Sequence, residues 1–225
     1  MNKYKPRFVY TVGICCFTWC VLATVLFAHA ANNRHYKLVA FGDSLTAGYG
    51  LADVDSFPTQ LQLLLKNIGY NVTVINAGVS GDTTAGGLAR LDWSIGEDVD
   101  GVIIELGAND ALRGISPGVT RKSLEQILTR IKERKIAILL TGMLAPPNLG
   151  KDYANAYNEI FPDLARKFTV VFYPFFLKDV ASIPSLNQAD GLHPTAAGVG
   201  IIARNILPKI EELLKNITLN NPTPQ

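Results

Sequence analysis

Cysteine and histidine are scarce in this chain, which has three of each among its 225 residues. The cysteines, at positions 15, 16 and 20, all lie in an apolar N-terminal segment, so the rest of the chain can form neither a disulfide nor a thiol nucleophile. The histidines, His29, His35 and His193, form no cluster with carboxylates at the spacing of metal ligands. We therefore expect a domain that is stabilised by its hydrophobic core and that uses no metal or other cofactor.

A strong charge of either sign is also missing. The formal net charge is +2, and three positive charges, those of Lys3, Lys5 and Arg7, belong to the first thirty residues. The remainder of the chain is therefore slightly acidic and has no basic stripe that would bind nucleic acid or an anionic membrane surface. We expect no nucleic-acid partner, no stable membrane insertion once the N-terminal segment has been removed, and a monomer.

Residues 1–30 have the three parts of a secretory signal peptide. The basic start is followed by an apolar run from about Phe8 to Phe27, and residues 28–30 (Ala-His-Ala) match the pattern that signal peptidase cleaves. We expect cleavage before Ala31 and a folded domain, residues 31–215, in the periplasm or secreted. The apolar run is longer than usual for a signal peptide, so an uncleaved membrane anchor remains an alternative.

Strands and helices alternate along the rest of the chain, whose hydrophobic content suits one domain. Apolar runs predict five strands, at 37–41, 71–76, 101–106, 136–140 and 169–172. Amphipathic patterns predict helices at about 56–69, 117–134, 152–167 and 195–215, and a further helix that includes residues 88 and 91. This alternation implies right-handed crossovers and a parallel sheet with helices on both faces, an α/β fold. The tail at 216–225 is expected to be disordered.

The first predicted strand ends in a turn that contains a serine. Gly42 interrupts the apolar run just before Ser44, where a lone serine would ordinarily cap the next helix. Near the C-terminus, however, Asp190 precedes His193 by three residues and can reach Nδ1 of its imidazole. That contact would leave Nε2 free to take a proton from a serine. The three residues therefore indicate a nucleophile, a base and a carboxylate that orients the base.

A second serine, Ser116, lies in a formal Gly-x-Ser-x-Gly match at 114–118. In α/β-hydrolases this pattern follows a strand, and the residue after the serine supplies an N–H to the oxyanion hole. Here no strand precedes the serine, and Pro117 has no N–H. We instead predict that Ser116 caps a helix with Pro117 at its first position.

Acyl transfer also requires hydrogen-bond donors for an oxyanion. Gly81 and Asn109 follow the second and third predicted strands, in turns rich in small and polar residues. Taken singly, each would be an ordinary turn or capping residue. Because ligands bind beyond the carboxyl ends of strands in open parallel sheets, we expect both residues beside Ser44.

Four short blocks occur in the order typical of one hydrolase family. They are Gly-Asp-Ser-Leu at 42–45, Gly-Val-Ser-Gly-Asp at 78–82, Gly-Ala-Asn-Asp at 107–110 and Asp-Gly-Leu-His-Pro at 190–194. With these blocks the chain resembles the SGNH, or GDSL, hydrolases over nearly all of the mature sequence. Within that family it is similar to bacterial arylesterases, thioesterases and lysophospholipases.

The resemblance implies a three-layer, flavodoxin-like fold around a five-stranded parallel sheet. It also implies an oxyanion hole formed by the N–H groups of Ser44 and Gly81 and the side-chain amide of Asn109. Ala108 departs from the family pattern, which often has a second glycine there, and its methyl group could tighten the turn that holds Asn109.

The sequence therefore predicts an exported serine hydrolase that cleaves acyl or aryl esters, thioesters or lysophospholipids through an acyl-enzyme. The loop after the fourth strand is unusually apolar, and its residues Leu144, Ala145 and Pro146 are expected to line an acyl or aryl groove or else to pack on the core. Two alternatives remain open: an esterase that deacetylates glycans, and an exported, non-catalytic protein that binds acyl groups or lipids.

Overall fold

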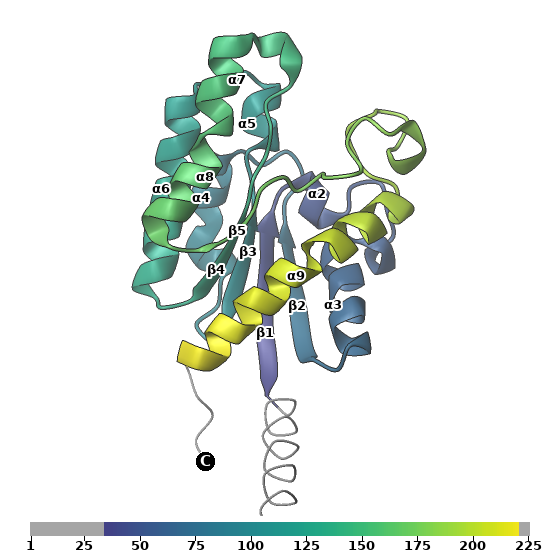
Figure 1. Cartoon of the computed structure of the whole chain (residues 1–225), viewed down its shortest axis with the longest axis vertical. Helices are drawn as coiled ribbons and strands as arrows, with labels where there is room; N and C mark the ends of the chain where they lie inside the picture. Colours follow the sequence, from purple (N-terminus) through teal and green to yellow (C-terminus); the bar gives the residue numbers. More distant parts are fainter. Residues whose placement is uncertain (1–33, 221–225) are drawn as a thin grey trace, which may run out of the picture. The chain divides into compact units, whose positions relative to one another are not determined.

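Five strands form in the computed structural model, which describes residues 34–220 (Figure 1). The strands are β1 (His35–Gly42), β2 (Asn71–Gly78), β3 (Gly101–Glu105), β4 (Ala137–Thr141) and β5 (Val171–Tyr173). They form one sheet in the order β2-β1-β3-β4-β5, with every neighbouring pair parallel. This is the strand order of flavodoxin-like folds, so the predicted α/β fold is confirmed.

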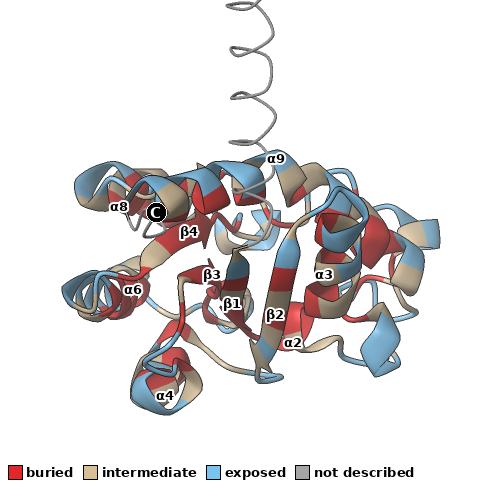
Figure 2. Ribbon diagram, turned by 90° about the horizontal axis from the view of Figure 1, so that it is seen from below, coloured by how far each residue is buried: buried red, intermediate tan, exposed pale blue. Residues whose placement is uncertain are grey.

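Helices cover both faces of the sheet. The longer ones are α3 (Phe57–Asn67), α4 (Thr84–Ser94), α6 (Pro117–Glu133), α8 (Ile160–Phe168) and α9 (Ala196–Asn220). The shorter ones are α2 (Ser44–Ala47), α5 (Ala108–Leu112), α7 (Lys151–Asn158), and the 3-10 turns η1 (Asp53–Asp55), η2 (Pro147–Leu149) and η3 (Pro184–Leu186). Helices α3 and α9 lie on one face, whereas α4 and α6 lie on the other (Figures 1 and 2).

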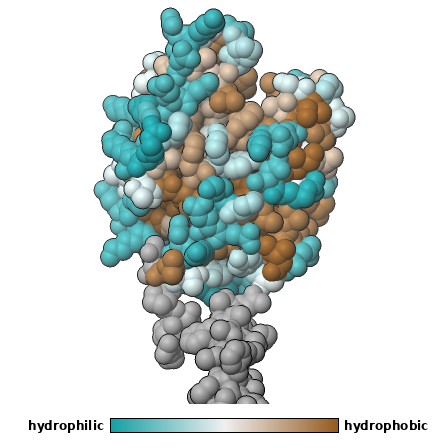
Figure 3. Space-filling view, viewed as in Figure 1, coloured by the Kyte–Doolittle hydropathy of each residue, from teal (hydrophilic) through white to brown (hydrophobic). Residues whose placement is uncertain are grey.

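The central strand β3 is buried along its whole length, which shows that the core lies on both faces of the sheet. On one side, Leu61 and Leu65 of α3 face inward at helical spacing, and on the other Leu124 and Leu128 of α6 do the same. The buried residues accordingly line the strands and the inner sides of the helices (Figure 2). On the outer face shown in Figure 3, hydrophobic and hydrophilic residues are interspersed.

Several boundaries differ from those predicted by one or two residues or more, and three of the differences have an identifiable cause. The single helix expected at 152–167 is divided into α7 and α8 at Glu159, because Pro162 has no N–H to donate to the carbonyl four residues earlier. The strand expected from 169 begins at Val171, since Thr169 adopts a left-handed conformation (φ 50°) that ends α8. Helix α9 continues to Asn220, which corrects the tail predicted from 216. The buried Ile217 extends the apolar face of this helix and explains the extra turn.

The predicted signal peptide, its cleavage site before Ala31 and the last five residues of the predicted tail lie outside the described residues. Among the helices of residues 34–220, none combines the length and the apolar character needed to span a bilayer.

Two leucines of α3 provide a matched test of this packing. Leu61 is fully buried, so Leu61→Ala should lower the free energy of unfolding by about 2–5 kcal/mol through lost apolar burial and a residual cavity. Leu63 is 51% exposed, and Leu63→Ala should change that free energy by less than about 0.5 kcal/mol. Urea unfolding followed by circular dichroism measures both, and equal losses would contradict the packing of Leu61 and not Leu63 against the core.

Candidate active site

The carboxyl ends of β1, β2 and β3 meet at one edge of the sheet. Gly42 at the end of β1 is level with Gly78 of β2 and with Glu105 of β3. Strand β1 lies between the other two, so the turn after it has theirs on either side. Helices α2 and α5, which begin in these turns, lie at this end of the strands (Figure 1). The chain passes from β1 to β2 on one side and then to β3 on the other, so the strand order reverses at β1. In an open parallel sheet, ligands bind at such a reversal, beyond the carboxyl ends of the strands.

A tight turn presents Ser44 at the start of α2. Asp43 caps this helix, because its carboxylate accepts a hydrogen bond from the backbone N–H of Leu45 (3.0 Å). The turn requires glycine at position 42, since a Cβ there would lie 2.1 Å from the Thr46 hydroxyl and 2.5 Å from the Glu105 carbonyl oxygen. Ser44 is 9% exposed, so most of its surface is covered while its hydroxyl faces His193.

Ser44, His193 and Asp190 form a continuous series of hydrogen bonds. Ser44 Oγ lies 2.9 Å from His193 Nε2, and His193 Nδ1 lies 2.7 Å from Asp190 Oδ2. Asp190 Oδ1 also accepts hydrogen bonds from the backbone N–H groups of His193 (3.0 Å) and Leu192 (2.9 Å). The backbone bond from His193 and then the bond from its side chain lower the pKa of Asp190 to about 2. The three predicted residues thus lie together, with an ionised carboxylate at one end.

Asn109 lies beside the Ser44 turn, and Gly81 lies in the turn after the neighbouring strand β2. Asn109 Nδ2 donates to Asp43 Oδ2 (3.1 Å) and to the carbonyl oxygen of Asp82 (2.9 Å). Both hydrogens of the amide are therefore directed at protein acceptors, so an oxyanion would have to share or replace one of them. Gly81 adopts a φ of +84°, and Arg113 Nη2 donates to its carbonyl oxygen (2.8 Å).

A buried pair of carboxyl groups, which the sequence reasoning missed, lies beneath the serine. Glu105 Oε2 accepts hydrogen bonds from Thr46 Oγ1 (2.8 Å) and from the backbone N–H of Asp43 (3.3 Å). Its Oε1 is buried and has no hydrogen-bond partner within the described part of the chain. Burial raises the pKa of Asp43 to about 6, and burial together with the Asp43 charge raises the pKa of Glu105 well above its usual range. The signal that could have revealed Glu105 was an acidic residue at the end of an otherwise apolar strand.

Arg90 of α4, a second residue that was missed, joins the ends of two strands. Its guanidinium donates to the carbonyl oxygens of Gly42 (2.8 Å) and Ala77 (2.9 Å) and pairs with the carboxylate of Asp82. It also lies over the ring of Phe41, 4.3 Å from the ring centroid. Arg90 therefore fixes the turns after β1 and β2 relative to each other.

The apolar loop predicted to bind substrate begins at the same sheet edge, after β4. Leu144 is 47% exposed, whereas Met143 before it is buried in the core. The N–H of Ala145 donates to Asn158 Oδ1 (2.9 Å), and Pro146 is half-buried. The loop thus combines a packed residue with an exposed apolar one.

Ser116 lies just before α6, with Pro117 at the first helical position, as predicted. The expected cap is wrong in one respect, because the Ser116 side chain accepts no hydrogen bond from the helix. His35 lies at the start of β1, where Nδ1 is 3.0 Å from Asn71 Oδ1, so it is at the opposite end of the strands from Ser44.

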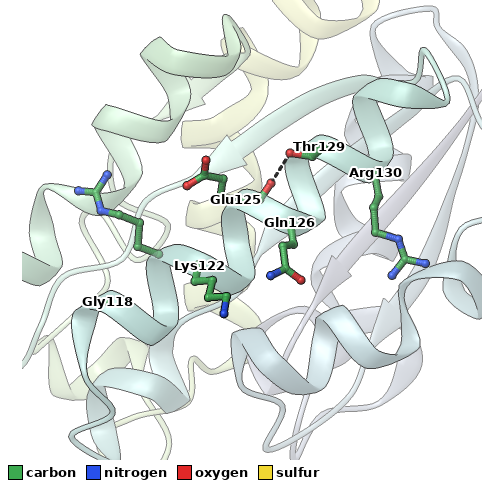
Figure 4. Close-up of a pocket in the computed structure, with 7 residues that line it drawn as sticks. Gly118, Lys122, Glu125, Gln126, Thr129 and Arg130 are labelled. Atoms are coloured by element: carbon green, nitrogen blue, oxygen red, sulfur yellow. Dashed lines mark hydrogen bonds between the residues drawn. The ribbon is translucent and has the colours of Figure 1, made fainter.

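A hollow of about 510 Å³ lies along α6 (Figure 4). The residues that line it are Gly118, Arg121, Lys122, Glu125, Gln126, Thr129 and Arg130. The close-up shows the Thr129 hydroxyl bonded to the Glu125 carbonyl oxygen within the helix. None of these lining residues belongs to the turns after β1, β2 and β3, so this hollow is separate from the Ser44 site.

The buried carboxyl of Asp43 should give stability a measurable pH dependence. Its pKa is raised from 3.8 to about 6, so the folded state binds this proton more tightly than the unfolded state. The resulting stabilisation is present below about pH 4 and is lost as the pH rises through about 6. The free energy of unfolding of the wild type, relative to that of Asp43→Asn, should therefore fall between pH 4 and 6 in urea titrations.

Asp98 supplies the control, because its hydrogen bond from Lys37 lowers its pKa. The free energy of unfolding of the wild type, relative to that of Asp98→Asn, should therefore decrease as the pH falls. This dependence on pH is opposite in sign to that expected for Asp43. A rise in the Asp43 difference between pH 4 and 6 would contradict the buried position of that carboxyl.

Curated relatives cover most of this chain. It is 40% identical over 200 residues to an arylesterase of Vibrio mimicus, which covers 88% of this chain and 98% of that protein. It is 36% identical over 180 residues to thioesterase 1/protease 1/lysophospholipase L1 of Escherichia coli K12, which covers 80% of this chain and 85% of that protein.

A solved structure and a family pattern agree with these matches. The crystal structure of TesA is similar with a TM-score of 0.75 and 36% identity, over 79% of this chain and 99% of that one. The pattern of the GDSL-like lipase/acylhydrolase family matches residues 40–201, which include Ser44, Asp190 and His193. The chain therefore belongs to the GDSL-like lipase/acylhydrolase family.

Proposed function

We propose that this protein is an exported serine hydrolase that cleaves carboxylic esters and thioesters through an acyl-enzyme. The observation that carries the proposal is the series of hydrogen bonds from Ser44 Oγ through His193 to the ionised Asp190. The relatives named arylesterase and thioesterase 1/protease 1/lysophospholipase L1 support the same class of reaction.

In the proposed acylation step, Ser44 Oγ attacks the carbonyl carbon of the substrate. Its proton passes to His193 Nε2, 2.9 Å away, and the negative charge of Asp190 stabilises the imidazolium through Nδ1. The imidazolium then protonates the departing alcohol or thiol. In the second step, His193 activates a water molecule, which releases the acid and regenerates Ser44.

The oxyanion that forms in both steps needs donors beside Ser44. We assign this role to the N–H groups of Ser44 and Gly81 and to the side-chain amide of Asn109. Because both hydrogens of Asn109 already have acceptors, its contribution requires the oxyanion to share or replace Asp43 or Asp82 as the acceptor of one of them. The bond that remains would keep the amide in place during the reaction.

The substrate proposal rests on the loop after β4. The exposed side chain of Leu144, with Ala145 and Pro146, would contact the acyl or aryl part of the substrate at the edge of the sheet where Ser44 lies. An apolar surface there favours acyl and aryl groups over the sugars of an acetylated glycan. Comparing the turnover of aryl esters, acyl thioesters and acetylated sugars tests this preference.

The proposed mechanism predicts that Ser44 and His193 act as a unit. Ser44→Ala should abolish hydrolysis of an aryl ester, His193→Ala should lose nearly as much rate, and the double variant should lose little more. An organophosphonate should label the wild type but not Ser44→Ala, as shown by intact-protein mass spectrometry. A non-catalytic binding protein would remain unlabelled.

Ser116→Ala is the matched control for this prediction. The Ser116 side chain makes no capping bond, so this variant should keep wild-type activity and change the free energy of unfolding by less than about 0.5 kcal/mol. Loss of activity in Ser116→Ala, with Ser44→Ala folded and active, would contradict the assignment of the nucleophile.

Export is proposed from the basic start, the apolar run and the Ala-His-Ala sequence at 28–30. After expression in a Gram-negative host, mass spectrometry should find the mature chain beginning at Ala31 in the periplasmic or secreted fraction. A chain that begins at Met1 in the membrane fraction would instead support the uncleaved anchor.

A further inference from the structure

The loop that carries Asp190 and His193 is closed by its own hydrogen bonds. The backbone N–H of Gln188 donates to the carbonyl oxygen of His193 (2.7 Å), and that of Gly191 donates to the carbonyl oxygen of Gln188 (2.9 Å). These bonds, with those to the Asp190 carboxylate, hold the acid against the imidazole. They do not hold the loop to Ser44, which is 149 residues away from His193 in the sequence.

The side chain of Gln188 connects these two segments. Its Nε2 donates to the carbonyl oxygen of Tyr49 (2.7 Å) and to that of Pro194 (3.0 Å), the residue after His193. The N–H of Tyr49 in turn donates to the carbonyl oxygen of Ser44 (3.1 Å). One amide group thus joins the backbone beside the serine to the backbone beside the histidine.

Gly50 leaves the space that this connection needs. A Cβ at position 50 would lie 2.3 Å from Gln188 Oε1, and the φ of Gly50 is +74°. Any side chain at position 50 would therefore both strain the backbone and displace the Gln188 amide.

Tyr49 completes the contact through its ring. The ring centroid lies 4.5 Å from that of the His193 imidazole, at an interplanar angle of 37°. The carbonyl oxygen of Tyr49 is the acceptor for Gln188, so the amide also fixes the residue that covers one face of the imidazole.

We propose that Gln188 is a positioning residue that holds the His193 loop against the Ser44 turn and so sets the distance between Nε2 and Oγ. This inference rests on the proposed function, because it concerns the same pair of groups. The amide is neutral and both of its acceptors are backbone carbonyls, so it acts through geometry rather than through charge. Misplacement of a reacting group by about 1 Å can cost about 10²-fold in rate, so loss of this connection should be visible in kcat.

The test uses the full chain and an aryl ester. Gln188→Ala should lower kcat by about 10- to 100-fold with little change in KM, because the reacting groups and not the substrate site are displaced. The rate constant for inactivation by an organophosphonate should fall by a similar factor, since that reaction also needs activated Ser44. The pH of half-maximal activity on the acid side should stay unchanged.

Gln188→Glu separates geometry from charge. The carboxylate has the shape of the amide but cannot donate to the two carbonyl oxygens, so the rate should fall at least as far as in Gln188→Ala. Its negative charge beside His193 favours the imidazolium, so here the acid-side midpoint should move to higher pH.

Gln62→Ala is the matched control. The Gln62 side chain also bonds to a distant part of the backbone, since its amide oxygen accepts from the N–H of Val74 in β2 (2.9 Å), but Gln62 lies outside both segments. This variant should keep wild-type kcat and the wild-type inactivation rate. If Gln188→Ala does not fold by circular dichroism, Gln188→Met, which preserves the length of the side chain without its donors, decides the question.

The outcomes distinguish this inference from the proposed function. Labelling of the wild type, without labelling of Ser44→Ala, supports the serine hydrolase whatever Gln188 does. A folded Gln188→Ala or Gln188→Met with wild-type kcat and inactivation rate overturns the positioning role, and so does a change confined to KM. An unlabelled wild type overturns the proposed function itself.

Discussion

The register of the parallel sheet is the constraint on which the site depends. Because Gly42 is level with both Gly78 and Glu105, the turns after β1, β2 and β3 begin at the same height and their residues can converge. A shift of one residue in β1 would reverse the faces of its side chains and carry Ser44 away from His193. The buried apolar faces of the strands make such a shift costly, so core packing and site geometry share one cause.

Polar groups beneath Ser44 extend this constraint from the sheet to the site. Asp43, Thr46 and Glu105 are buried, where unpaired polar groups are costly, and Glu105 Oε2 accepts hydrogen bonds from both the Asp43 backbone and the Thr46 hydroxyl. Asp43 reaches further, because its carboxylate also accepts from Asn109. Arg90 adds bonds to the ends of β1 and β2. Hydrogen bonds of buried polar groups therefore tie the turn that carries the proposed nucleophile to the ends of β1, β2 and β3.

Much of the fold could be predicted from the sequence, because each strand and helix has its own local pattern. Some boundaries that differ depend on particular residues. Pro162 removes one hydrogen-bond donor inside an otherwise helical stretch, and α9 is longer than predicted because the side chain of Ile217 is buried. Ser116 shows the opposite limit. The sequence predicted that Ser116 lies just before a helix. Whether its hydroxyl accepts a hydrogen bond from a backbone N–H of that helix depends on a side-chain rotamer that the sequence does not specify.

Sequence by itself determined the chemical types at the site and the contact between Asp190 and His193, since three residues of chain bring a carboxylate and an imidazole within reach. Tertiary structure alone brought His193 to Ser44, and with it the Gln188 amide, the Tyr49 ring and the room left at Gly50. It also decided that Glu105 is buried under the serine and that both hydrogens of Asn109 are engaged. The physical reason is distance along the chain: local geometry limits contacts across a few residues, whereas contacts across 149 residues exist only after the sheet and its helices have packed.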